Sequence, residues 1–268
     1  MKVHTAQLAG DGRNADRVFL TDNAVIVLDG ASAFEPVDIE PSTYAESLGR
    51  TIADELTMVP EAPIADAVAK AIRRTTAKLD LRPGASPSST VAILRTRFGA
   101  ADLYVLGDSP IHYGTDHLAQ RLVDDRLSLV ATPEHERYLA QLRAGHGYDD
   151  AHRATLAWLQ RAQRQARNVE GGYWIAETDP AAASHAFAKT VHRDAIEWAV
   201  IATDGAADFI DYCCCGWRDI AQFDKTQLVA LLKRIHDWED QSDPDGRHLP
   251  RAKRHDDKTI GVVSSLWA

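Results

Sequence analysis

Residues 24–30 read AVIVLDG, five apolar residues that run directly into an aspartate and a glycine. A short, continuous apolar run rich in β-branched residues is typical of a strand that is buried on both faces. Asp-Gly is a frequent turn dipeptide, so Asp29 is expected at the end of this strand. The pattern returns in WAVIATDG at residues 198–205, where a second buried strand is expected to end beside Asp204.

Helical and strand patterns surround these two runs. Periodic apolar or Ala-rich sequence predicts helices over three stretches: residues 41–56, 64–79 and 225–238. Short apolar runs between turn residues predict strands over four others: residues 90–94, 102–106, 111–113 and 259–264. We expect the first three of these strands to form a meander. Residues 133–168 are helical in pattern and rich in Arg, Gln and Glu, which indicates a helical insertion between sheet strands.

Length and composition favour a single globular domain over residues 1–268. A chain of 268 residues and 29.4 kDa suits one sizeable core with an insertion, here expected around 133–168. With 45% hydrophobic and 26% charged residues, a globally disordered, collagenous or coiled-coil protein is excluded. The formal net charge of −9 and the scattered Lys and Arg argue against nucleic acid or an anionic membrane as the main partner. No apolar stretch approaches the roughly 18 residues of a membrane span and no leader pattern is seen, so a cytoplasmic protein is expected.

Several conspicuous groups of side chains are expected to carry no chemistry. Adjacent cysteines are too crowded for an ordinary set of disulfides or a spaced zinc site: Cys213, Cys214 and Cys215. Four histidines are scattered without metal-binding spacing and are expected on the surface or in the core: His112, His117, His146 and His152. One acidic stretch lacks the alternation and closing Glu of an EF-hand and is expected to be a solvated loop: Asp237, Glu239, Asp240, Asp243 and Asp245.

The candidate chemistry lies in aspartates at strand ends and turns: Asp16, Asp29, Asp108, Asp204, Asp208 and Asp256. A hard divalent cation such as Mg²⁺ or Mn²⁺ prefers carboxylate, carbonyl and water oxygens as ligands. Gly30 and Gly205 have no side chain, so the backbone there can approach a metal closely. Carboxylates that crowd together without a cation repel each other and raise their pKa values, so a cluster of them predicts bound metal. A single Asp-Gly is a common turn, and the prediction therefore depends on the combination.

Six sequence blocks follow one another along the chain: NADR (14–17), AVIVLDG (24–30), SSTVAI (88–93), VLGDS (105–109), AVIATDGAAD (199–208) and DDKTIGVV (256–263). Their succession resembles the metal-dependent serine/threonine protein phosphatases of type 2C, in a bacterial-type single-domain form. The resemblance implies an α+β fold, a four-layer α-β-β-α sandwich of two mainly antiparallel sheets flanked by helices. It also implies a metal cleft at one end of the two sheets.

The resemblance assigns roles to individual residues by motif. Asp29 corresponds to the carboxylate that bridges two metal ions, and Gly30 corresponds to the residue that offers its backbone carbonyl. Asp204 and Asp256 resemble ligands of one ion. Asp16 corresponds to a residue that acts through bound water.

Two further positions match those of an additional, weaker ion: Asp108 and Asp208. The implied cofactors are therefore two Mg²⁺ or Mn²⁺ ions, with room for a third. The implied reaction is hydrolysis of phosphoserine or phosphothreonine by a hydroxide that bridges the two ions, with a phosphorylated protein in a signalling system as the partner. The resemblance makes no prediction about the oligomeric state.

Three departures from the family pattern stand beside these motifs. Ala15 replaces the usual Glu in the first block, which removes a carboxylate that helps to hold metal-bound water. Asp11 occupies the position of the arginine that clamps phosphate in some members, and Arg13 or Arg17 is the nearest substitute. Ala31 stands where many eukaryotic members have a histidine, a candidate acid for the leaving oxygen, so that water would take over this task.

These departures leave alternatives open. The chain could be a catalytically weakened module that binds a phosphoprotein or a regulatory partner. It could also hydrolyse small phosphates or nucleotides, because metal chemistry by itself does not specify the group that carries the phosphate. The insertion at 133–168 lies where the family has its variable flap beside the active site, where it would either select substrates or cover the sheet.

Overall fold

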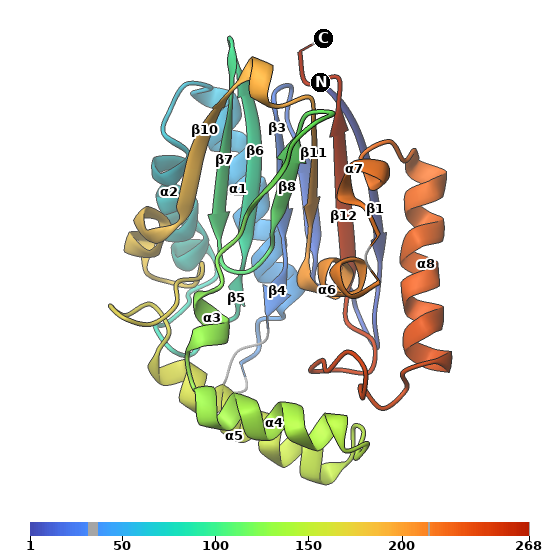
Figure 1. Ribbon diagram of the computed structural model, residues 1–268. Helices are drawn as coiled ribbons and strands as arrows, with labels where there is room; N and C mark the ends of the chain where they lie inside the picture. The colour runs from blue at the N-terminus through green and yellow to red at the C-terminus, as the bar shows by residue number, and fades with distance from the viewer. Residues whose placement is uncertain (32–36, 214, 268) are drawn as a thin grey trace.

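The computed structural model describes residues 1–31, 37–213 and 215–267 (Figure 1). Two five-stranded sheets lie face to face, and helices cover the outer face of each. All strand pairings within the two sheets are antiparallel. The fold is therefore the α+β, four-layer α-β-β-α sandwich that the sequence motifs implied.

The first sheet contains both terminal strands and the strand before Asp204. Its order is β1 (Lys2–Leu8), β12 (Lys258–Ser264), β11 (Trp198–Ala202), β8 (Ile111–Gly114) and β9 (Ala119–Leu122). Its outer face is covered by α6 (Asp204–Tyr212), α7 (Trp217–Ile220) and α8 (Lys225–Gln241). A capping box fixes the start of α8, because Asp224 and Gln227 each accept a hydrogen bond from the other's backbone N–H.

The second sheet contains the strand before Asp29. Its order is β10 (Phe187–His192), β7 (Ala100–Leu106), β6 (Val91–Arg97), β3 (Ala24–Leu28) and β2 (Arg17–Leu20). Helices α1 (Pro41–Met58) and α2 (Ile64–Lys78) cover its outer face. A two-stranded sheet of β4 (Gly30–Ala31) and β5 (Ser88–Ser89) extends from the end of β3, and short helices η1 (Pro180–His185) and η2 (Arg193–Ala195) flank β10.

Three hydrophobic layers explain why the two central strands are apolar on both faces. Ile26 and Leu28 of β3 pack against α1 and α2, whereas Val25 and Val27 face the other sheet. In β11, Ile201 lies in the layer between the sheets while its neighbours pack under the helices. Because fully burying one such side chain contributes about 1.5–3 kcal/mol, these strands anchor the sandwich and hold the residues at their ends in place.

The predicted meander is wrong, because β8 belongs to the other sheet. Strands β6 and β7 form a hairpin, but β8 pairs with β11 and β9 instead of β7. Between β7 and β8, Gly107 has a left-handed φ of 86°, and Pro110 has no N–H to donate to a strand ladder. The chain therefore leaves one sheet and crosses to the other at this turn, which also carries Asp108.

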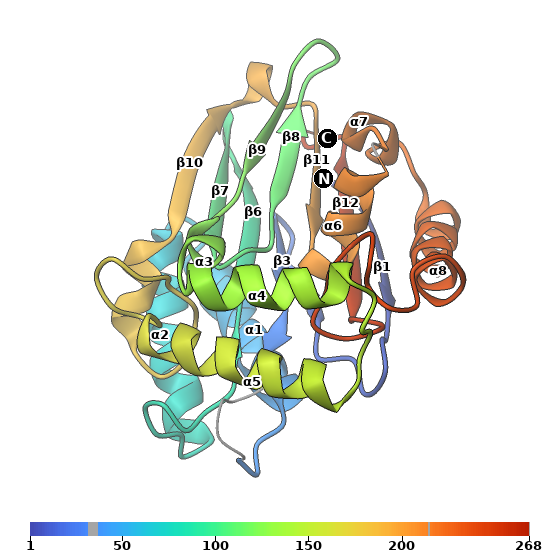
Figure 2. The same ribbon diagram turned by 60° about the horizontal axis from the view of Figure 1, so that its bottom comes forward.

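Three helices lie between β9 and η1, and the last two of them occupy the segment expected to be an insertion, residues 133–168. They are α3 (Arg126–Leu129), α4 (Thr132–Arg143) and α5 (Asp150–Gln165). Helices α4 and α5 pack on each other through a small core of Tyr138, Leu142 and Leu159. Figures 1 and 2 show this pair lying across one end of the two sheets. None of the helices in the described part of the chain is long and apolar enough to cross a membrane.

Candidate metal centre

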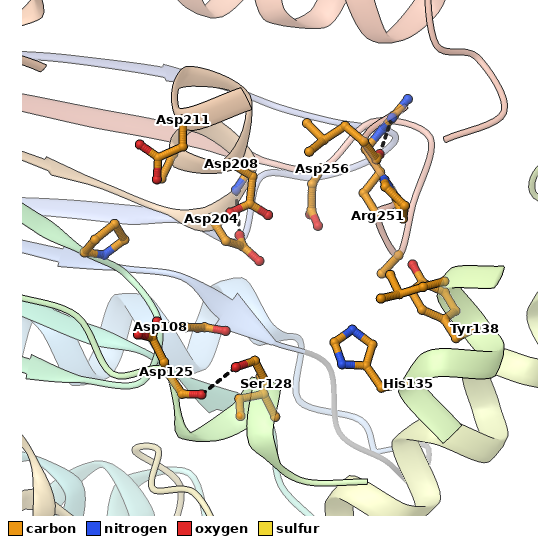
Figure 3. Close-up of a pocket in the computed structure, with 18 of the residues that line it drawn as sticks. Asp108, Asp125, Ser128, His135, Tyr138, Asp204, Asp208, Asp211, Arg251 and Asp256 are labelled. Atoms are coloured by element: carbon orange, nitrogen blue, oxygen red, sulfur yellow. Dashed lines mark hydrogen bonds between the residues drawn. The ribbon is translucent and has the colours of Figure 1, made fainter. Parts of the chain in front are cut away.

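Carboxylates from both sheets meet at the end of the sandwich that faces α4 and α5. Asp29 directly follows β3 of the second sheet, whereas Asp204 and Asp256 lie next to β11 and β12 of the first. The carboxyl groups of Asp29 and Asp204 lie within hydrogen-bonding reach of each other. Figure 3 shows Asp204 and Asp256 bordering the same space as Asp108. The structure thus brings together residues that are up to 227 positions apart, from Asp29 to Asp256.

Burial and mutual repulsion raise the pKa values of these groups. Burial is the main reason that the pKa of Asp29 lies well above its usual range, and the charges of Asp204 and Asp16 add to the increase. Burial also raises the pKa of Asp204, with the nearby charge of Asp256 as the next cause. Such a cluster is unfavourable when ionised unless positive charge lies between its members.

The pKa values of three neighbouring carboxylates are also raised by burial and by nearby negative charge. Asp16 is 1% exposed, and burial raises its pKa to about 8 despite hydrogen bonds with Thr259 and Thr203 that lower it. Burial, followed by the charge of Asp204, raises the pKa values of Asp108 and Asp208 to about 7. The six aspartates singled out in the sequence therefore lie in one connected cluster.

The chemistry of this cluster fits a hard divalent cation. All side-chain ligand atoms are carboxylate oxygens, which Mg²⁺ and Mn²⁺ prefer. Asp16 Oδ1 is buried and has no hydrogen-bond partner among the described residues, whereas Oδ2 accepts a hydrogen bond from Thr203. An oxygen oriented in this way and left unpaired is suited to a metal-bound water.

Two glycines allow the strand ends to approach one another. A Cβ atom on Gly30 would lie 2.7 Å from the carbonyl oxygen of Ala15, and one on Gly205 would lie 2.1 Å from that of Asp257. Both distances are shorter than any tolerated contact with a backbone oxygen, so a side chain at either position would push the segments apart. The Asp-Gly pairs are therefore required for close packing of the segments that carry the carboxylates.

Hydroxyl groups hold the two carboxylate-bearing turns of the second sheet together. The Thr90 backbone N–H donates to the Asp29 carbonyl at 3.0 Å, and the Asp29 N–H donates to Thr90 Oγ1 at 3.1 Å. Thr90 Oγ1 also bonds to Ser109 Oγ at 2.7 Å. Thr90 and Ser109 belong to the SSTVAI and VLGDS blocks, so these blocks couple Asp29 to the turn that carries Asp108. Sequence reasoning matched the blocks and did not find this role.

Asp257 fixes the loop before Asp16. Its carboxylate accepts hydrogen bonds from the N–H groups of Gly10 at 2.9 Å and Ala15 at 2.8 Å. An asparagine has one acceptor oxygen and would compete less well for two such donors. Asp257 of the last block therefore has a structural role that the sequence did not reveal.

A buried ionic network supports the loop that carries Asp256. Lys258 Nζ lies 2.8 Å from Glu239 Oε2 and donates to the Asp256 carbonyl oxygen, also at 2.8 Å. His255 Nδ1 lies 3.0 Å from the same Glu239 oxygen, and Arg251 pairs with Asp243 at 2.9 Å.

The expectation of a solvated acidic loop is wrong in two respects, because Asp237, Glu239 and Asp240 lie in α8 and two members of the stretch are buried. Glu239 and Asp243 are each 2% exposed. Cationic side chains from 8 to 19 residues further along the chain compensate their charge, and that pairing cannot be found from local pattern. Of the cysteines, Cys213 and Cys215 are free thiols, and Cys214 lies outside the described residues.

A cleft of about 510 Å³ separates the carboxylates from the helical insertion. Figure 3 shows Asp108, Asp204 and Asp256 on the side of the sheets, and His135 and Tyr138 of α4 opposite them. Two arginines also line it, Arg121 and Arg251.

The arginines proposed from the sequence as phosphate contacts lie elsewhere. Arg13 pairs with Glu40 at 2.9 Å and its side chain is 70% exposed. Arg17 donates hydrogen bonds to Glu46 and to the backbone oxygens of Asn14 and Asp16. Its guanidinium therefore has a structural role. Neither arginine is among the described residues that line the cleft.

Comparisons with known proteins place this geometry in context. No protein-family model and no curated protein matches the sequence. Among solved structures, the PPM Ser-Thr phosphatase MsPP from Mycobacterium smegmatis, in complex with cacodylate, has a TM-score of 0.57 at 17% identity, with 98% of each chain covered. PppA, a regulatory component of the T6SS in Pseudomonas aeruginosa, has a TM-score of 0.55 at 17% identity, over 98% of this chain and 96% of that one.

A third structure contains metal. The catalytic domain of the serine threonine protein phosphatase PstP in complex with two manganese ions has a TM-score of 0.54 at 12% identity, over 97% of this chain and 96% of that one. All three likenesses extend over nearly the whole chain and include its helical insertion. The chain therefore has the fold of the PPM serine/threonine phosphatases.

Proposed function

We propose that this protein is a metal-dependent phosphatase that hydrolyses phosphoserine and phosphothreonine in proteins. The observation that carries the proposal is the cluster of mostly half-buried aspartates at the facing ends of the two sheets. Five of them have raised pKa values, and no ion pair with Lys or Arg is found for these five in the described part of the chain: Asp16, Asp29, Asp108, Asp204 and Asp208. Lys253 lies 2.8 Å from Asp256, so the six aspartates together keep an excess of negative charge that suits divalent cations.

The proposed ligands follow the motif assignments. Asp29 and the Gly30 carbonyl would contact two ions, Asp204 and Asp256 would complete the site, and Asp16 would act through water. Asp108 and Asp208 would hold a weaker third ion. When bound, Mg²⁺ or Mn²⁺ supplies a water of lowered pKa and neutralises charge that develops on the phosphoryl group.

The chain's own residues then orient and enclose the reaction. Thr203 holds one oxygen of Asp16 and leaves the other free to orient the attacking water. Lys258 and Glu239 hold the loop of Asp256 through contacts that are shielded from solvent. Helices α3 to α5 would act as a flap over the cleft, so that a phosphorylated segment lies between α4 and the sheet ends.

The test is phosphate release with Mn²⁺, using p-nitrophenyl phosphate and peptides that carry phosphoserine, phosphothreonine or phosphotyrosine. Wild type should be active on the aryl phosphate and on the Ser and Thr peptides, and chelation should abolish the activity. Asp204→Asn should be inactive, while Asp22→Asn, a substitution at an exposed position far from the cluster, should behave as wild type. Full activity of Asp204→Asn would refute the metal assignment. A preference for free nucleotides would refute the protein substrate, and bound Mn²⁺ without any turnover would refute the enzyme.

A further inference from the structure

The cleft has no acidic proton donor at the position beside the Asp-Gly turn of β3. Ala31 lines the cleft there, and its methyl group has no proton to give. The alkoxide of serine or threonine is a poor leaving group, and a positioned general acid contributes about 10²–10⁴-fold to the rate of such a step. If the chain hydrolyses these substrates, a side chain elsewhere in the cleft can supply the proton.

The opposite wall of the cleft carries one histidine among the described lining residues, His135 of α4. Figure 3 shows its imidazole projecting from the helix into the space bordered by Asp108, Asp204 and Asp256. Histidine is the side chain whose unperturbed pKa places its proton exchange near neutral pH. The imidazole is half-buried, so solvent can reprotonate it between turnovers.

The arginines and the tyrosine of the cleft are committed or unsuited as proton donors, and Asp108 and Asp208 are the proposed ligands of a third ion. Arg251 bonds to Asp243 and to the carbonyl oxygens of Leu249 and Asp243. Arg121 lies between Asp125 at 3.9 Å and Asp211 at 3.7 Å. Burial raises the pKa of Tyr138, which keeps its hydroxyl protonated through the whole neutral range.

The first turns of α4 hold His135 in this orientation. The helix starts at Thr132 after Ala131, which has a left-handed φ of 52°, and Pro133 lies in its first turn. Tyr138, one turn further along, packs its ring 6.3 Å from His135 and 5.6 Å from His152 of α5. The face that carries His135 and Tyr138 is therefore anchored in the small core between the two helices and aimed at the carboxylates.

We propose that His135 is the general acid that protonates the leaving serine or threonine oxygen; this inference rests on the proposed function. The bond from water to phosphorus forms as the bond from phosphorus to the side-chain oxygen breaks. The electron pair of the broken bond goes to that oxygen, which takes a proton from the His135 imidazolium. The neutral imidazole then regains a proton from solvent, which in turn receives the one released by the attacking water.

The test compares two classes of leaving group. p-Nitrophenolate leaves without a proton, whereas an alkoxide needs one. His135→Gln should lower kcat on a phosphothreonine peptide by about 10²-fold and change kcat on p-nitrophenyl phosphate less than about threefold. His146→Gln, at an exposed position in the same insertion, is the matched control and should leave both rates unchanged. Mn²⁺ affinity, measured by calorimetry, should be the same in all three proteins.

Added imidazole should partly restore phosphopeptide hydrolysis by His135→Ala, and it should leave hydrolysis of the aryl phosphate unchanged. Equal loss on both substrates, a weakened Mn²⁺ affinity, or no loss on the peptide would overturn the assignment of His135. Because hydrolysis of the aryl phosphate by wild type tests the metal chemistry separately, failure of the proposed function shows as no turnover of either substrate. That result would overturn both proposals.

Discussion

Two clusters of ionisable side chains lie near the same end of the molecule and are built in opposite ways. In the candidate metal centre, the half-buried carboxylates of Asp29 and Asp204 face each other with no ion pair to Lys or Arg among the described residues. In the α8 cluster, which comprises His236, Glu239, His255 and Lys258, the carboxylate of Glu239 has an ammonium at 2.8 Å and an imidazole at 3.0 Å. In the part of the chain that the structure describes, the six aspartates of the metal centre have one ammonium beside them, Lys253 at 2.8 Å from Asp256, whereas the single carboxylate of the α8 cluster has both an ammonium and an imidazole.

The contrast shows that spacing alone is a poor sign of a metal site. His236, Glu239 and His255 each offer a ligand atom, and these atoms lie within 4.8 Å of one another. The Lys258 ammonium is already paired with Glu239 at 2.8 Å, however, and would repel a divalent cation bound to the same carboxylate. An excess of negative charge distinguishes the candidate metal centre, and the α8 cluster is a support for the loop that carries Asp256.

The largest expected effect is on catalysis. Asp204→Asn should lower Mn²⁺-dependent hydrolysis of a phosphothreonine peptide by at least about 10³-fold, since it removes a proposed ligand of the ion that would neutralise charge on the phosphoryl group. Steady-state kinetics with saturating Mn²⁺ provide the measurement. Residual activity within tenfold of wild type would remove the distinction between the two clusters.

The next effect is on stability in the α8 cluster. Glu239→Gln should lower the free energy of unfolding by about 3 kcal/mol, because it leaves the buried Lys258 ammonium without its anion. The double variant Glu239→Leu with Lys258→Met should be less destabilised than either single change, as judged by urea denaturation. If Zn²⁺ stabilised wild type through these residues, the α8 cluster would have to be treated as a metal site.

Removing a carboxylate from the candidate metal centre should raise the stability of the metal-free protein, the opposite of the effect expected in the α8 cluster. In excess chelator at pH 8, Asp204→Asn should be more stable than wild type by about 1–2 kcal/mol, because it removes one of several repelling buried charges. Asp16, Asp108 and Asp208 have pKa values raised to about 8, 7 and 7, so the folded chain binds their protons more tightly than the unfolded chain. Their contribution to stability is therefore complete below about pH 4 and is lost as the pH rises through 7 to 8.

Chemical denaturation at several pH values, with Asp22→Asn as control, would measure this gain. Destabilisation of the metal-free protein by Asp204→Asn would indicate that the cluster is held by hydrogen bonds and is not under electrostatic strain.

His112 represents a third way to bury an ionisable group, which is to keep it neutral. It stacks on Trp217 with ring centroids 3.8 Å apart, and its Nε2 has no hydrogen-bond partner in the described chain. Burial lowers its pKa from 6.5 to about 4, so the unfolded chain takes up a proton first as the pH falls. Stability should therefore decrease between pH 6.5 and pH 4, by about 1 kcal/mol at pH 5.5 relative to pH 8.

This pH dependence of stability has the opposite sign to that of the candidate metal centre, whose contribution to stability is lost as the pH rises. Subtracting the pH profile of His112→Gln from that of wild type isolates the contribution of the imidazole. A difference that stays flat from pH 8 to pH 5 would mean that His112 takes up a proton as readily in the folded as in the unfolded chain.

The sequence predicted best what depends on local pattern. The apolar runs before Asp29 and Asp204 identified β3 and β11, because each strand is buried on both faces and so lacks polar positions. That the aspartates meet could be predicted only from the order of the six blocks, since nothing local brings residue 29 to residue 204.

What the sequence did not predict depends on contacts between distant segments. The crossing of β8 to the first sheet is decided by which strand it meets, and the strand's own residues do not encode that choice. The charges of Glu239 and Asp243 are compensated by Lys258 and Arg251, which lie beyond the reach of any periodicity. The position of His135 opposite the carboxylates depends on how α4 docks across the cleft.

Asp29 follows a strand of one sheet, and Asp204 and Asp256 lie next to strands of the other. The spacing of the proposed ligands is therefore set by the apolar side chains between the sheets. Val27 from one side and Ile201 from the other lie in this layer. A methyl group lost there would change the separation of two carboxylates that it never touches. Under the proposed function, substitutions in the hydrophobic interior of this protein are constrained by ion affinity as well as by folding.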